Sequence, residues 1–104
     1  MAETHFDGVL TMPALLDIGQ DIGALVLYTG AELRDKEIEV SPTGDDAKRV
    51  HTAIHERRVN GRTIFAGIYP ALREGDYTIW GESGQPAGHV TITGGKVAKV
   101  DWRE

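Results

Sequence analysis

Asn60-Gly61 is a turn signal set between two runs of residues that favour extended backbone. An Asn-Gly pair fits the type I′ turn of a two-residue hairpin, because both central residues of that turn adopt positive φ. Residues 63–69 follow and are rich in β-branched and aromatic side chains, which suit a pleated surface. Ile64 and Phe65 begin two apolar faces of this run, and a strand with two apolar faces is usually covered on both. The sequence therefore predicts a β-hairpin whose second strand is central.

Pro70 is expected to end that strand, because proline has no N–H to donate to a sheet ladder. The next strand is expected at 76–80. Side chains alternate along a strand, so Tyr77 and Ile79 share one face and Trp80 lies on the other. We expect Trp80 to be exposed there and available for binding.

The whole chain divides into about seven strands at the regular spacing that is typical of a β-sandwich. We predict an all-β fold, a mostly antiparallel sandwich, with Gly94-Gly95 joining the last two strands as a second tight hairpin. The expected strands are 24–29, 37–40, 47–59, 63–69, 76–80, 89–93 and 96–102. The strand 24–29 is apolar on both faces, so we expect it to be central. In 37–40 apolar and acidic residues alternate, so Ile38 and Val40 are expected to face the core.

Residues 47–59 fit a strand or a helix. We favour a strand, because the Asn-Gly turn needs one before it. On a helix, His51 and His55 would share a face and could bind one metal ion, with His5 or His89 as a further ligand. On a strand the same two side chains are about 13 Å apart, too far to share an ion.

The chain of 104 residues is long enough for one domain, 1–104, and carries no cysteine. Residues 1–22 contain many apolar side chains, but Pro13 interrupts any single helix or strand through them, so we expect an irregular N-terminal segment packed on the sandwich. The start of the chain has no leader pattern and no apolar run is long enough to span a membrane. We therefore expect a cytoplasmic protein without a membrane partner.

The formal charge of −5 argues against nucleic-acid binding, which needs Lys and Arg to replace the phosphate counterions. A local exception is a basic group that contains Arg57, Arg58 and Arg62 together with Lys48 and Arg49. Such charges often protect a strand edge from aggregation. Their alternative role is a binding site for an anion or an acidic partner.

Residues 69–79 read Tyr-Pro-Ala-Leu-Arg-Glu-Gly-Asp-Tyr-Thr-Ile. This segment resembles prealbumin-like sandwiches, in particular the carboxypeptidase-regulatory-like and collagen-adhesin B-type repeats, and the resemblance extends over 23–102. It implies a prealbumin-like fold. The hydroxyisourate hydrolases share that fold, but their C-terminal Tyr-Arg-Gly-Ser is absent here, since this chain ends Val-Asp-Trp-Arg-Glu. We therefore expect none of their catalytic residues.

Three functions from different classes remain. The first is a non-catalytic module that binds another protein, or forms a homo-oligomer, through a sheet face or edge. The second is a small-molecule or carbohydrate-binding module, in which Trp80 would stack on the ligand. The third is a metal-binding protein that uses His51 and His55. No motif for catalysis or for a cofactor is found, so we expect no cofactor and favour the first function.

Overall fold

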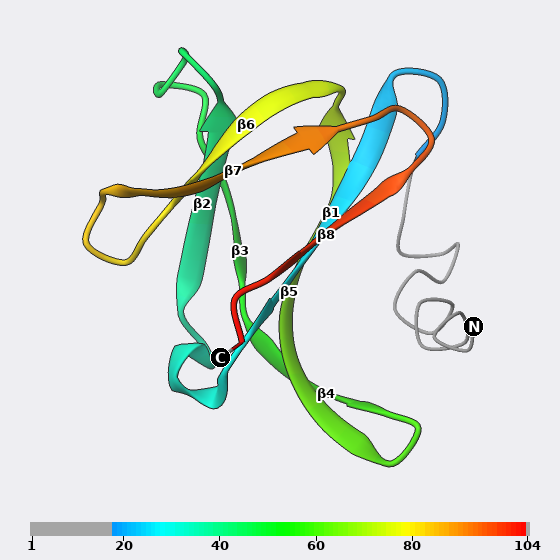
Figure 1. Ribbon diagram of the computed structural model, residues 1–104, viewed down its shortest axis with the longest axis vertical. Helices are drawn as coiled ribbons and strands as arrows, with labels where there is room; N and C mark the ends of the chain where they lie inside the picture. The colour runs from blue at the N-terminus through cyan, green and yellow to red at the C-terminus, as the bar shows by residue number, and fades with distance from the viewer. Residues whose placement is uncertain (1–17, 104) are drawn as a thin grey trace.

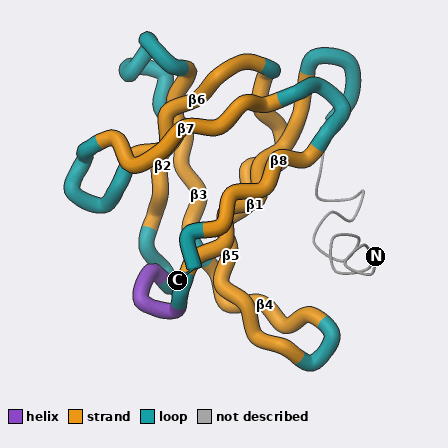
Figure 2. Tube along the Cα trace, viewed as in Figure 1, coloured by secondary structure: helices purple, strands orange, loops and turns teal. Residues whose placement is uncertain are grey.

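The computed structural model describes residues 18–103, which fold into two four-stranded sheets packed face to face (Figures 1 and 2). Sheet A has the strand order β4-β5-β1-β8, and sheet B has the order β3-β2-β6-β7. The strands and one short 3-10 helix (η2) are β1 Ile22–Thr29, η2 Ala31–Leu33, β2 Glu37–Pro42, β3 Val50–Ala53, β4 His55–Val59, β5 Arg62–Arg73, β6 Gly75–Trp80, β7 Pro86–Ile92 and β8 Val97–Asp101.

The predicted all-β, mostly antiparallel sandwich is confirmed. The pairing of β1 with β8 is parallel, and each of the other strand pairs in the two sheets is antiparallel. β1 lies between β5 and β8, as its two apolar faces predicted. The predicted segment 1–22 falls largely outside the described residues, and its last residues form a turn in which Gly19 and Ile22 are bridged.

The described strands exceed the expected number because the predicted strand 47–59 is two strands in different sheets. β3 pairs with β2 in sheet B, and β4 pairs with β5 in sheet A. The chain changes sheet at Ile54, whose side chain is fully buried. The Ile54 N–H donates to the Lys36 carbonyl at 2.9 Å, and its carbonyl accepts from the Asp35 N–H at 2.7 Å. The change of sheet therefore leaves no unsatisfied backbone group at this residue.

The prediction that Pro70 ends its strand is wrong, because β5 continues to Arg73. The pairing with β1 shifts register here: Leu25 lies opposite Tyr69, whereas Gly23 lies opposite Leu72. One residue of β1 therefore faces two residues of β5, which is a β-bulge. A bulge interrupts the hydrogen-bond ladder locally, so a proline without an N–H is tolerated in it.

The two predicted glycine turns have different outcomes. Asn60 and Gly61 have φ values of 53° and 79°, as a type I′ turn requires, so the central hairpin is confirmed. The hairpin predicted at Gly94-Gly95 is wrong, since β7 and β8 belong to different sheets. Gly94 packs directly on the backbone of Gln20, where any side chain would clash. This close approach lets the chain cross from sheet B to sheet A.

The main core lies between the sheets. It includes Leu25 and Leu27 of β1, Ile38 and Val40 of β2, and Ile79 of β6, all exposed by 1% or less. The predicted inward direction of the two β2 side chains is therefore correct. Within residues 18–103, no helix is long and apolar enough to cross a membrane.

Candidate functional site

β7 is an edge strand of sheet B, hydrogen-bonded to β6 on one side (Figure 1). Its sequence, Pro-Ala-Gly-His-Val-Thr-Ile, holds no Asp, Glu, Lys or Arg. The edges of sheet A differ: β4 carries three charged residues in five, and β8 carries two in five. β3, the other edge of sheet B, is also without these residues but is only four residues long. β7 is therefore the longest uncharged edge among the described strands.

The two ends of β7 differ in regularity. The pairing with β6 shifts register between Ile79 and Trp80. Trp80 lies opposite Pro86, which has no N–H to donate. Proline and bulges are devices by which proteins protect an edge from pairing with another chain. From Gly88 to Ile92 the pairing is regular, and this part of the edge lacks both devices. A further strand could therefore pair along Gly88–Ile92.

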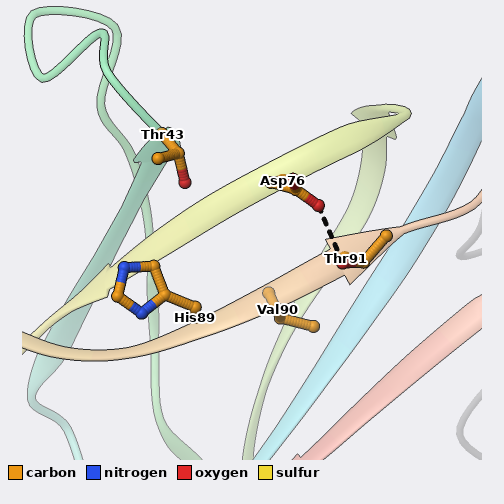
Figure 3. A pocket seen from close by; sticks show the side chains of 5 residues that line it. All are labelled: Thr43, Asp76, His89, Val90 and Thr91. Atoms are coloured by element: carbon orange, nitrogen blue, oxygen red, sulfur yellow. Dashed lines mark hydrogen bonds between the residues drawn. The ribbon is translucent and has the colours of Figure 1, made fainter.

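A hollow of about 400 Å³ lies on the outer face of sheet B beside this edge (Figure 3). His89 and Thr91 pair with Thr78 and Asp76 of β6, so these side chains share one face. That face is the outer one, because the alternating residues Tyr77 and Ile79 belong to the inter-sheet core. The residues that line the hollow are Thr43, Asp76, His89, Val90 and Thr91.

The hollow offers several hydrogen-bonding groups. The Thr91 hydroxyl donates to the Asp76 carboxylate at 2.8 Å (Figure 3). The backbone N–H of Thr43 donates to the Asp76 carbonyl at 2.9 Å, which holds the end of β2 against β6. His89 is exposed at the rim, with Val90 beside it. Such a hollow can accept one polar side chain of a partner.

The expectation of an exposed Trp80 is wrong. Trp80 does lie on the outer face of its sheet, but only 7% of it is exposed. The guanidinium of Arg49 covers the ring at 3.9 Å from its centroid, and the same guanidinium pairs with Glu39 at 2.8 Å. The indole N–H donates to the Ser41 hydroxyl at 3.0 Å. The ring is thus used inside the protein, and a ligand could stack on it only after displacing Arg49.

The predicted basic group is divided between two ends of the molecule. Lys48 and Arg49 lie in the loop between β2 and β3, and the three other arginines lie on the β4–β5 hairpin, at the opposite end of the long axis (Figure 1). On the hairpin, Arg57 and Arg62 face one side and Arg58 faces the other, as the pairing shows. The basic residues named in the sequence are therefore not all on one surface, whereas Arg57 and Arg62 lie on the same side of the hairpin.

The two histidines of the metal hypothesis lie on different sheets. His51 is on β3 and His55 is on β4, so the helical alternative on which that hypothesis depended is wrong. His51 instead approaches the Glu37 carboxylate at 3.9 Å. Within residues 18–103, no three His, Asp or Glu side chains are placed to hold a metal ion together.

A second hollow lies near the C-terminal end of β8, lined by η2 and by Asp101, Trp102 and Arg103. Asp101 accepts two side-chain hydrogen bonds from Arg103, at 2.8 and 2.6 Å. These bonds, together with one from the Arg103 backbone, lower the pKa of the Asp101 carboxyl to about 2. The pair neutralises its own charges, so this hollow presents no free charge of either sign from these two residues.

The comparisons with known proteins support the fold and do not assign a family. No protein-family model matches the chain, and a search of curated proteins finds no match. Among solved structures, a leucine-rich repeat protein from Bacteroides thetaiotaomicron is similar, with a TM-score of 0.51 and 15% sequence identity. The similarity covers 81% of this chain and 12% of that chain. At this identity the likeness concerns the fold alone, and the resemblance to prealbumin-like domains stays a prediction.

The hollow beside β7 could not be identified from the amino-acid sequence. Its residues come from β2, β6 and β7, and only the pairing of these strands brings them together. The sequence does contain one indication of this edge, because residues 86–92 form an extended run without acidic or basic residues. Strand order was needed to show that this run is an edge.

Proposed function

We propose that this domain is a protein-binding module that takes an extended segment of a partner along β7. The observation that carries the proposal is the regular, uncharged edge at Gly88–Ile92. An unpaired edge presents a row of backbone N–H and C=O groups, and pairing with an added strand satisfies them. Most natural edges carry charges or irregularities that prevent this pairing, as β4 and β8 do here.

The hollow lined by Asp76, His89 and Thr91 supports the same proposal. In strand addition, backbone hydrogen bonds supply affinity, and pockets beside the edge read alternate side chains of the added strand. The carboxylate of Asp76 and the imidazole of His89 favour a side chain that donates hydrogen bonds, such as Ser, Asn or Lys. The partner expected is thus an extended peptide with a polar, donor-bearing residue at its centre.

The test begins with a phage-displayed library of random peptides, panned against the full chain. Selected peptides are then measured by fluorescence polarisation against two variants, His89→Lys and His55→Lys. Both replace an exposed histidine on an edge strand by lysine. A lysine on the binding edge discourages strand addition. His89→Lys should therefore weaken the peptide, whereas His55→Lys should leave its affinity unchanged.

NMR chemical shifts identify the surface that is used. On titration with a selected peptide, the largest backbone shifts should fall at 88–92. Peptides that bind both variants equally, or that shift β4 rather than β7, would rule out the proposed edge. If no peptide is selected and the chain associates with itself at rising concentration, the module is a homo-oligomer instead.

A further inference from the structure

Sheet A has a second apolar cluster on the face that points away from sheet B. We call it the outer apolar face, and its buried members are Val26, Tyr28, Val59, Ile64 and Ala66, each 0–8% exposed. Ile68 and Val97 pack against them. Every member of this cluster belongs to sheet A itself.

The direction of these side chains follows from the alternation of the strands. In β1, Leu25 and Leu27 belong to the inter-sheet core, so Val26 and Tyr28 between them point outward. In β5, Phe65 packs on the inter-sheet core, so Ile64 points outward as well. Sheet B lies on the inner side and cannot cover this face.

An apolar sheet face is stable only when a second layer covers it. Side chains that are only 0–8% exposed are covered by other atoms. The described apolar side chains that pack against this cluster, Ile68 and Val97, belong to the same sheet and do not form a second layer. The cation of Arg103, about 5.0 Å from the Tyr28 ring centroid, covers one end. A further layer is therefore needed over the middle of the face.

We propose that residues 1–17 of the same chain lie across the outer apolar face and cover it. This segment contains nine apolar side chains, among them Phe6, Leu10 and Leu15, and no Lys or Arg. It enters the fold at Ile18, directly before the turn into β1, the strand at the middle of the face. Four strands span about 15 Å, and 17 residues reach up to about 55 Å when extended, so the length is sufficient.

Charge supports the same occupant. The segment carries three acidic residues, Glu3, Asp7 and Asp17. On the hairpin, Arg57 and Arg62 share the side of Ile64 and Val59, so their cations border the outer apolar face. Arg57 is half-buried, and its Nε donates to the Ala66 carbonyl at 3.3 Å. Acidic groups on the covering segment would meet these guanidinium groups at the rim of the face.

The test uses the full chain, which has no cysteine, so a single introduced thiol takes a spin label at one position only. His55→Cys places the label on the side of the outer apolar face, because His55 pairs with Ala66. His51→Cys is the matched control: it is also an exposed histidine on an edge strand, but it pairs with Glu39 on the outer face of sheet B.

Paramagnetic broadening of backbone amide signals then reports which face is close to residues 1–17. The label at position 55 should remove or strongly weaken these signals, and the label at position 51 should leave them. Equal effects from both labels, or no effect from either, would overturn the proposal. Broadening that appears only when labelled and isotope-enriched molecules are mixed would assign the cover to a second copy, which also overturns it.

A second measurement does not depend on a label. In the full chain, Leu15→Ser combined with Leu16→Ser removes apolar contacts from the segment. The double variant should unfold at a lower temperature than the parent and should lose the broadening from position 55. An unchanged unfolding temperature would show that these leucines cover nothing. The proposed binding at β7 concerns the opposite sheet, so the two proposals can fail separately.

Discussion

Gly67 of β5 tests the arrangement in which β3 crosses over β5. It lies on the inner side of sheet A, and a Cβ added there would be 2.7 Å from Thr52 Cγ2 and 3.0 Å from Ile54 Cδ1. Real Cβ contacts of this kind are rarely closer than about 3.4 Å. Gly67→Ala should therefore overpack the core and lower the free energy of unfolding by about 2 kcal/mol.

The clash has a specific remedy. Thr52→Ser removes the methyl group that the new Cβ would contact. Because Thr52 is half-buried, this substitution alone should lower the free energy of unfolding by about 0.5 kcal/mol. The double variant should lose only about 1 kcal/mol, since relief of the clash offsets most of the two separate losses. The remaining loss comes from Ile54, which still lies close to the new methyl.

Urea unfolding of the parent, the two single variants and the double variant measures this cycle. At about 4–8 °C per kcal/mol for a domain of this size, thermal melts should show the same order. Gly88→Ala is the matched control, because a Cβ at Gly88 meets nothing within 4 Å and its φ is not positive. It should change stability little. A neutral Gly67→Ala, or strictly additive losses in the double variant, would refute the packing of β3 on β5.

Three further predictions concern buried and paired groups. Tyr69→Phe removes the buried hydrogen bond that the Tyr69 hydroxyl donates to the Ile38 carbonyl, and should cost about 1–2 kcal/mol in urea unfolding; an unchanged midpoint would contradict it. Trp80→Ala should lower the free energy of unfolding by about 3–5 kcal/mol in the same measurement, because the ring is buried. Removing an exposed ring would change that free energy little. Ionised Asp101 stabilises the fold above its ordinary pKa of 3.8, and this contribution is lost as pH falls toward the folded value of about 2. An NMR titration should give that low midpoint in the parent and a value near 3.8 in Arg103→Gln; equal midpoints would show that Arg103 is not the cause.

The sequence by itself determined the local structure. Asn60-Gly61 fixed a hairpin because few residue pairs tolerate positive φ at both positions. Alternation identified Ile38 and Val40 as core residues, since side chains of a strand point to opposite faces in turn. The apolar faces of 24–29 correctly placed that strand in the middle of a sheet.

The tertiary structure decided which strands are neighbours. The sequence of 47–59 is extended throughout, and only packing of Ile54 between the sheets shows where the chain changes sheet. The glycine at position 94 reads as a hairpin turn, but the backbone of Gln20, distant in sequence, makes it a crossing point.

The candidate site depended on the same kind of information. Trp80 points to the outer face as alternation predicts, yet Arg49 from another strand connection covers it. Likewise, residues 86–92 are visibly uncharged, but only strand order makes them an edge and sets Asp76 and His89 around one hollow. Alternation and turn chemistry act over a few residues and can be read from the chain. Strand order, burial and edges depend on contacts between distant segments, and these exist only once the chain has folded.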